Sequence, residues 1–299
     1  MVRLRSRRLT GGMAEQRQHQ QQHILVLGGT GTTGRRVAAR LRALGHTVRI
    51  GSRTGEPVRF DWTDQATWDP ALDGIDAVYV VPHEGARLTR PFLALAEKAG
   101  VRRAVLLSGR GVDVADYMAD DNPSAITHID GDAAIRETGL EWTVVRPSWF
   151  AQNFSEGFFT DSVRGGELAL AAADGLVPFV DAEDIADVVV AALTEDGHHG
   201  RTYELSGPRL LTFAEAAGAI SAASGRPLRY VPLAPEEFTA GLVAAGMPEQ
   251  DAGWFADMLS PVRRGIEAHL SEGVREALGR EPRDFTVFAA EAAESGAWK

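Results

Sequence analysis

The chain contains no cysteine, and it has no long apolar run. The absence of cysteine excludes disulfides, thiolate nucleophiles and cysteine-ligated zinc or iron–sulfur centres, and it favours a cytoplasmic protein. No stretch approaches the roughly 20 consecutive apolar residues that a bilayer crossing needs, so no membrane partner is expected. Lysine occurs only as Lys98 and Lys299, which restricts any lysine-dependent chemistry to those two positions.

The net charge is negative, but the first residues are basic. The whole chain has 31 Lys and Arg against 41 Asp and Glu, which gives a net charge of −10. Residues 1–22 contain five arginines and one glutamate, +4 in sum, which leaves −14 on the rest of the chain. An acidic body argues against phosphate-backbone binding, so no nucleic-acid partner is expected. The basic start lacks the apolar core of a signal peptide, and we predict a disordered tail over residues 1–22.

Strand and helix signals alternate through the first half of the chain. The run ILVLGG at 24–29 ends on glycine, as a buried parallel strand does, and residues 32–45 place their apolar side chains on one face of a helix. Further strands are expected at 46–53, 58–60, 75–81, 104–109 and 142–147. Strands separated by helices in this way predict an α/β fold with a Rossmann-type doubly wound parallel sheet.

The pattern loosens after Pro147 and becomes mostly helical. We therefore predict two folded parts. The first is an NAD(P)-binding Rossmann domain over residues 23–155, to which residues 176–206 return. The second is a smaller, mostly helical substrate-binding lobe formed by residues 156–175 and 207–299.

A glycine-rich segment lies between the first predicted strand and the first predicted helix. It reads Gly28-Gly29-Thr30-Gly31-Thr32-Thr33-Gly34, a GxxGxxG pattern. Gly28 permits a tight turn, Gly31 lets backbone N–H groups approach a diphosphate, and Gly34 lets the helix pack closely on the strand. A mononucleotide P-loop is excluded because the Gly-Lys-Ser/Thr ending is missing. The segment predicts a dinucleotide site.

The end of the second strand indicates which dinucleotide is bound. An NAD site usually has an acidic residue there for the ribose 2′-hydroxyl, whereas this chain has Ser52 and Arg53. An arginine fork suits a 2′-phosphate, so the predicted cofactor is NADP(H).

Several segments resemble the atypical short-chain dehydrogenases/reductases in the NmrA-like branch, and are most similar to the ergot-alkaloid reductases of the festuclavine and agroclavine dehydrogenase type. The resemblance runs from residue 24 to about residue 233 and rests on ILVLGGTGTTGRR, VRFDWTDQATW, AVYVVPHEG, VRRAVLLSGRG, WTVVRPSWFAQNFSE, VPFVDAEDIADVV and YELSGPRLLTFAEAA. It implies NADPH-dependent reduction of a C=N or conjugated bond in a small secondary metabolite. It also implies that Asp61 and Trp62 lie near the adenine.

The chain departs from the usual pattern of short-chain dehydrogenases, in which a tyrosine and a lysine four residues later protonate the substrate. None of the four tyrosines is followed by lysine at that spacing. His128 occupies the expected lysine position and Ser124 the expected tyrosine position. Hydride transfer to an iminium carbon neutralises a cation and needs no proton donor, so the missing pair fits such a substrate.

Three residues are predicted to be catalytic. His128 is a proton donor or a holder of the cofactor ribose, and Tyr117 is a further candidate acid. Asp113 belongs to the loop 111–121, whose four aspartates either attract a cationic substrate or form a solvated face.

The remaining site predictions follow the strand ends, where such folds bind their ligands. The residues expected to bind the dinucleotide are Gly28, Thr30, Gly31, Thr32, Thr33, Gly34, Ser52, Arg53, Asp61, Trp62, Val81, Pro82, Ser108 and His128. The residues expected to bind the substrate are His83, Trp149, Phe150, Asn153 and Phe154, although aromatic residues at this spacing also suit a core. No metal site is predicted.

The sequence thus predicts an NADPH-dependent reductase of a small, aromatic or iminium-type metabolite, working as a monomer or homodimer. Two alternatives stay open at this point. One is a non-catalytic NADP(H)-sensing regulator of the NmrA-like type. The other is a quinone or enone reductase, or an isomerase or cyclase, on the same fold.

Overall fold

The computed structural model describes residues 21–55 and 58–299. The predicted disordered tail, residues 1–22, therefore lies outside the described residues except for Gln21 and Gln22. The carbonyl of Gln22 accepts a hydrogen bond from the N–H of Thr47 at 2.9 Å, which aligns the start of the chain with the edge of the sheet.

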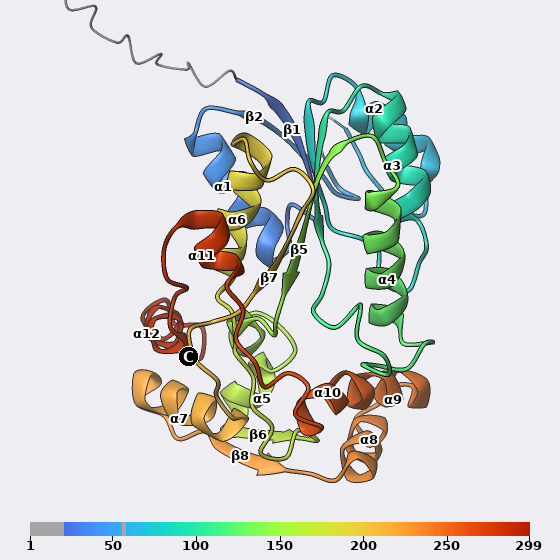
Figure 1. The fold of residues 1–299 in the computed structure, drawn as a ribbon. Helices are drawn as coiled ribbons and strands as arrows, with labels where there is room; N and C mark the ends of the chain where they lie inside the picture. The colour runs from blue at the N-terminus through green and yellow to red at the C-terminus, as the bar shows by residue number, and fades with distance from the viewer. Residues whose placement is uncertain (1–20, 56–57) are drawn as a thin grey trace, which may run out of the picture.

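A six-stranded parallel sheet with strand order β2-β1-β3-β4-β5-β7 forms the centre of the protein (Figure 1). Its strands are β1 (His23–Leu27), β2 (Thr47–Gly51), β3 (Ala77–Val80), β4 (Arg103–Leu107), β5 (Glu141–Pro147) and β7 (Arg201–Leu205). The chain winds outward from β1 to β2 and then crosses back to β3, so the winding direction reverses between β1 and β3. This topology confirms the doubly wound Rossmann-type sheet. Such sheets bind their ligands beyond the carboxyl ends of the strands, at the point where the winding direction reverses.

Helices cover both faces of the sheet, because each strand carries apolar side chains on both sides. One face is packed by α1 (Thr32–Ala43), α6 (Ala182–Thr194) and α11 (Gly273–Leu278), and the other by α2 (Trp68–Leu72), α3 (Thr89–Lys98) and α4 (Pro123–Arg136). In β1, Ile24 and Val26 belong to the core on the α1 face, and Leu25 and Leu27 belong to the core on the other face.

The strand expected at residues 58–60 is absent. Phe60 is instead buried at the centre of an aromatic cluster, where its ring lies 5.2 Å from that of Trp62 and 5.6 Å from that of Phe92. Burial of this ring removes its apolar surface from water and so stabilises the loop that carries it. The sixth strand of the sheet is β7, which the chain reaches only after α6.

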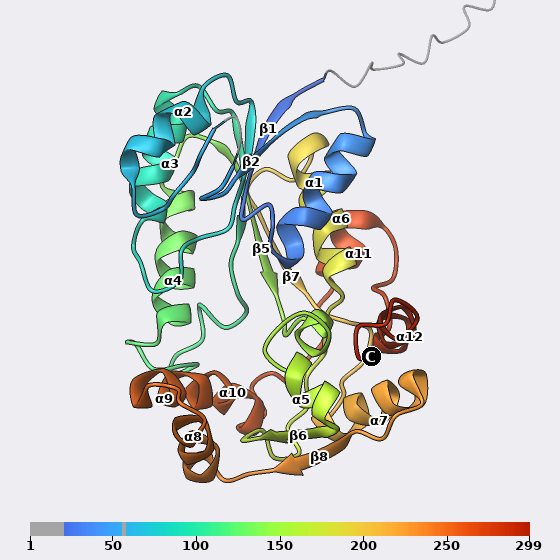
Figure 2. The ribbon, with the colours of Figure 1, turned by 180° about the vertical axis from the view of Figure 1, so that it is seen from behind.

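A second lobe lies beyond the end of the sheet where β5 and β7 finish (Figure 2). Its elements are α5 (Thr160–Gly165), β6 (Glu167–Leu170), α7 (Phe213–Ser224), β8 (Arg229–Pro232), α8 (Pro235–Ala244), α9 (Glu249–Met258), α10 (Ser260–Arg263) and α12 (Phe285–Glu294). Strands β6 and β8 pair in parallel, and a separate core of buried aromatic rings holds this lobe together.

The C-terminal part of the chain is shared between the two lobes. The predicted substrate lobe takes in all of residues 207–299, but α11 packs against α6 and β7 of the sheet. Gly273 allows this return, because a Cβ atom there would overlap the carbonyl oxygen of Glu204. Within the described ranges, no helix combines the length and hydrophobicity that crossing a membrane requires.

Candidate active site

The turn between β1 and α1 forms a close-packed glycine cradle. Gly28 has a φ of +62°, and its carbonyl accepts a hydrogen bond from the N–H of Gly31 at 2.9 Å. A Cβ atom on Gly34 would overlap that same carbonyl oxygen, so only glycine lets the helix begin this close to the strand.

The N-terminus of α1 offers backbone donors to an anion. Gly31 occupies the N-cap, and no side chain caps the helix. The first N–H groups of a helix have no partner within it, and the helix dipole makes them attractive to a diphosphate. The side chain of Thr33, in contrast, is buried, and its hydroxyl accepts a hydrogen bond from Tyr79 at 3.0 Å. Of Thr33, only the backbone would therefore be available to a dinucleotide.

A cleft of about 490 Å³ opens beside this cradle, and we call it the cofactor half of the site. It is lined by Gly28, Thr30, Gly51, Ser52, Arg53, Thr54, Phe60, Asp61, Trp62, Thr63, Val81, Pro82 and His83. The structure thus brings Ser52, Arg53, Asp61 and Trp62 together with the segment that follows β3. The structure places His83, predicted as a substrate residue, in the cofactor half, because the chain from Val81 to His83 runs along the cradle.

Charged and aromatic side chains shape the far wall of the cofactor half. Arg53 is exposed, and it forms no ion pair with any residue in the described ranges, which leaves its guanidinium available to a phosphate. Asp61 is already engaged: the N–H of Thr63 and the guanidinium of Arg59 lower the pKa of its carboxyl group. Trp62 donates from its indole N–H to the carbonyl of Val81 at 3.2 Å, so it acts as a fixed wall.

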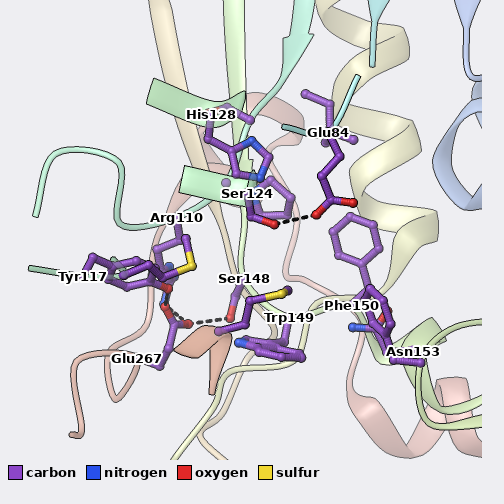
Figure 3. Close-up of a pocket in the computed structure, with 17 residues that line it drawn as sticks. Glu84, Arg110, Tyr117, Ser124, His128, Ser148, Trp149, Phe150, Asn153 and Glu267 are labelled. Atoms are coloured by element: carbon purple, nitrogen blue, oxygen red, sulfur yellow. Dashed lines mark hydrogen bonds and ion pairs between the residues drawn. The ribbon is translucent and has the colours of Figure 1, made fainter. Parts of the chain in front are cut away.

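A second cavity of about 260 Å³ follows where the strands end, and we call it the substrate half (Figure 3). It is lined by Glu84, Leu107, Ser108, Gly109, Arg110, Tyr117, Met118, Ser124, His128, Pro147, Ser148, Trp149, Phe150, Asn153, Phe158, Met258 and Glu267. The two halves meet at the segment after β3, since His83 lines one and Glu84 lines the other. Ser108 and His128, predicted as cofactor contacts, both lie in the substrate half.

His128 projects from α4 into the substrate half and is neutral at pH 7. Its ring lies against Gly109, where a Cβ atom would come within 2.8 Å of the ring carbon Cδ2. Burial lowers the pKa of His128 to about 4, against a smaller opposing effect of Asp132. Its Nδ1 atom is buried and has no hydrogen-bond partner in the described part of the chain.

Tyr117 reaches the substrate half from the loop 111–121. Its ring covers Gly111, whose φ is +85° and which has no room for a side chain. The phenol donates a hydrogen bond to the carboxylate of Glu267. Burial, reinforced by the charge of Glu267, raises the pKa of Tyr117 well above 10, so the phenol is a poor acid.

Glu267 is a functional candidate that the sequence did not reveal. It comes from the segment after α10, it is fully buried, and it accepts hydrogen bonds from Tyr117 and from the hydroxyl of Ser148 at 3.1 Å. The guanidinium of Arg110 lies 3.8 Å away. No local motif marks Glu267. The one local signal in the sequence is the pair of glycines on either side of Arg110, Gly109 and Gly111, which indicates that other side chains pack closely against this segment.

Glu84 is a second residue that the sequence reasoning missed. It follows Pro82 and His83, it is exposed, and its carboxylate accepts a hydrogen bond from Ser124 at 2.8 Å. Figure 3 shows this carboxylate on the side of the cavity opposite Glu267. Its place directly after the strand-end residues was a signal that could have found it.

Asp113 does not belong to the substrate half. Its carboxylate lies 2.8 Å from Arg146, which also binds the buried Asp132 at 2.8 Å. Arg146 lowers the pKa of the Asp113 carboxyl group. A buried arginine at the end of β5 needs counter-charges, and Asp113 supplies one of them. With Asp116 and Asp120 it lines a separate hollow.

The structure brings three of the four residues predicted between positions 149 and 154 to the substrate half. Trp149, Phe150 and Asn153 line the substrate half. Phe154 is completely buried and packs against Phe159, Phe179, Phe213 and Phe285 in the core of the second lobe. The chain turns through a short 3-10 helix at residues 151–154, which directs Phe154 away from the cavity.

Comparisons with known proteins agree with this geometry. A family profile described as NAD(P)H-binding matches residues 28–196. Agroclavine dehydrogenase of Claviceps fusiformis is 33% identical over 90% of this chain and 96% of its own length. The (4-alkanoyl-5-oxo-2,5-dihydrofuran-3-yl)methyl phosphate reductase of Streptomyces griseus is 37% identical over 91% and 98%. An NADPH-dependent quinone oxidoreductase of Escherichia coli, solved with NADPH, matches with a TM-score of 0.72 at 23% identity over 90% of this chain and 99% of its own.

The chain therefore belongs to the NAD(P)H-binding family. Within it, the protein is an atypical short-chain dehydrogenase/reductase related to the ergot-alkaloid reductases, and it is an NAD(P)H-dependent oxidoreductase. This confirms the predicted fold, enzyme class and NADP(H)-type cofactor.

The cradle and the cofactor half fit such a dinucleotide. The close approach of Gly34 to Gly28 and the uncapped start of α1 leave space and donors for a diphosphate. Gly28, Gly31 and Gly34 would hold that group, and Ser52 and Arg53 would hold a 2′-phosphate.

Proposed function

We propose that this protein uses NADPH to reduce a small, aromatic, cationic metabolite of the iminium type. The observation that carries the proposal is the composition of the substrate half. It joins a dinucleotide cradle to the carboxylate of Glu84, several aromatic side chains and two poor proton donors. We also propose that the protein works in the cytoplasm as a monomer or homodimer, without a nucleic-acid partner.

The poor acidity of the two candidate proton donors favours an iminium substrate over a simple carbonyl substrate. Reduction of a carbonyl creates an alkoxide that needs an acid with a pKa near the working pH. His128, with a pKa of about 4, is neutral at pH 7, and Tyr117 has a raised pKa and donates its hydrogen bond to Glu267. An iminium carbon becomes a neutral amine on reduction, so it requires neither residue as an acid.

The charges and rings favour a cation in this cavity. The carboxylate of Glu84 belongs to its wall and forms no ion pair within the described residues, whereas the carboxylate of Glu267 is paired with Arg110 at 3.8 Å. The rings of Trp149 and Phe150 provide faces that attract a cation. The Glu84 carboxylate and the aromatic rings together bind a flat cationic ring better than they bind a phosphate, and this distinguishes the proposed substrate from that of the Streptomyces relative.

The roles of the chain's own residues follow from this arrangement. When bound, the reduced nicotinamide supplies a hydride. Glu84 attracts and orients the cation, and Trp149 and Phe150 hold its ring and exclude water. Ser124 fixes the Glu84 carboxylate by its hydrogen bond.

The test compares N-methyl-3,4-dihydroisoquinolinium with 1-tetralone, a neutral ketone of similar shape, by following the absorbance of NADPH. We expect kcat/KM for the cation to exceed that for the ketone by about 100-fold. Glu84→Gln should raise KM for the cation about tenfold, because it removes a charge worth about 1.4 kcal/mol of attraction. Asp121→Asn, in the acidic loop outside the cavity, is the matched control and should leave KM unchanged.

A ketone that is turned over as fast as the cation, with Glu84→Gln without effect, would contradict the proposal. A reaction without enzyme is run beside each assay, since iminium ions accept hydride in solution as well.

A further inference from the structure

A third cavity of about 390 Å³ adjoins the substrate half, and we call it the arm cavity. It is lined by Glu84, Asn122, Pro123, Phe158, Met247, Asp251, Trp254, Phe255 and Met258. Glu84, Phe158 and Met258 line both cavities, so the two share a wall. In Figures 1 and 2, α8 and α9, which provide the far wall, lie beneath the start of α4.

Methionine is concentrated around these two cavities. The chain has five methionines, of which Met1 and Met13 lie outside the described residues. The other three are Met118 in the substrate half, Met247 in the arm cavity and Met258 in both. A flexible, polarisable thioether adapts to apolar ligands of different shape. This distribution indicates a surface made for apolar ligands, since none of these three methionines lies in the fully buried cores.

Phe158 stands at the shared wall in an exposed position. With 62% of its surface accessible, it is the most exposed large apolar side chain in the described ranges. Its ring lies 5.4 Å from that of Phe255. Apolar surface exposed in one patch marks a binding site, because covering it removes that surface from water.

Hydrogen bonds hold the arm cavity open. Asn122, almost completely buried at the start of α4, donates to the carbonyl of Trp254 at 3.2 Å and to Asp257 at 2.9 Å. The N–H of Ala119 donates to the same carboxylate at 2.9 Å. These bonds fasten α9 to the sheet domain at a fixed separation, so the cavity is a built feature.

We infer that the arm cavity is a second substrate subsite, which takes an apolar arm of the same molecule whose reducible head lies in the substrate half. The inference rests on the proposed function for the chemistry of the head. The class of ligand is a cationic aromatic ring that carries an aryl-alkyl or hydrocarbon arm. Glu84 and Asp251 on the walls disfavour an arm that ends in an anion.

The experiment measures binding without turnover, in the presence of NADP⁺. The ligands are the N-methyl and N-(4-phenylbutyl) forms of 3,4-dihydroisoquinolinium, which share a head and differ in the arm. We expect the long form to bind the wild-type protein more than about tenfold more tightly by calorimetry. Met247→Trp, which fills the arm cavity, should reduce this ratio to about one while leaving the N-methyl form within about twofold.

Val243→Trp is the matched control. It places the same bulky side chain on the exposed end of α8, outside both cavities, and should keep the wild-type ratio. Met247→Phe fills less of the cavity and should give an intermediate ratio, which keeps the test valid if the tryptophan variant folds poorly.

The results separate this inference from the proposed function. If neither cation is reduced but Met247→Trp still abolishes the advantage of the long arm, the reaction is wrong and the subsite stands. If both cations are reduced but the ratio is near one in the wild type, or unchanged in Met247→Trp, the subsite is overturned.

Discussion

The cofactor half and the substrate half of this site are built in different ways. The cofactor half combines the backbone of the glycine cradle with side chains from one part of the chain, between Gly28 and His83, that follows the first three strands of the sheet. The substrate half consists of side chains from segments spread between Glu84 and Glu267. A site made of backbone is tied to the fold and leaves a local motif. A site made of side chains can change its substrate while the fold stays the same.

The largest expected effect is in the cofactor half, where one added methyl group should disrupt the glycine cradle. Gly34→Ala places a Cβ atom onto the carbonyl oxygen of Gly28, which forces α1 away from β1. We expect NADPH affinity to fall about 100-fold or more, roughly 2.7 kcal/mol, in a fluorescence titration. Gly218→Ala, in α7 with open space around it, is the control and should bind NADPH normally. Normal binding by Gly34→Ala would remove the assigned role of the cradle.

The second prediction concerns His128 in the substrate half and its dependence on pH. Because the pKa of His128 is about 4 in the folded protein and about 6.5 in the unfolded chain, only the unfolded chain takes up this proton as the pH falls below 6.5. As the pH falls from about 7.5 to about 5, protonation of His128 in the unfolded chain therefore lowers the free energy of unfolding by up to about 2 kcal/mol. His128→Gln should lose this part of the pH dependence in urea unfolding.

The control for that measurement is His199→Gln, which changes an exposed histidine in the loop before β7. It should keep the pH dependence of the wild type. Equal slopes for His128→Gln and the wild type would show that the ring is not buried as a neutral group.

The smallest of the three expected effects concerns Arg53, which should distinguish NADPH from NADH in the cofactor half. Arg53→Ala removes an exposed guanidinium at the end of β2 and should weaken NADPH binding about tenfold, while NADH binding changes less than about twofold. Titrations with both dinucleotides test it. Arg42→Ala, an exposed arginine of α1 outside the cleft, controls for the change in net charge. An equal loss for both dinucleotides would show that Arg53 does not bind the 2′-phosphate.

The sequence predicted the sheet and the cofactor half well, because both depend on short-range patterns. Glycine spacing, apolar runs and the Ser52-Arg53 pair are local, and the structure brings those residues together as expected. The strand at 58–60 failed because the burial of Phe60 among aromatic side chains outweighs the weak preference of three residues.

The substrate half was less predictable, since its members meet only through tertiary structure. Glu267 lies far along the chain from Tyr117 and Ser148, and no spacing rule connects them. The position of Asp113 in the acidic loop suggested a catalytic role, but its carboxylate forms an ion pair with the buried Arg146. Phe154 shares a segment with Trp149 and Phe150 and still turns into the core.

The position of Glu267 sets the order in which a newly made chain can become active. A ribosome makes the residues that line the cofactor half, between Gly28 and His83, well before it makes Glu267, whose carboxylate fixes Tyr117 and Ser148. A growing chain therefore contains every residue that lines its dinucleotide cleft long before it contains all those of the substrate pocket.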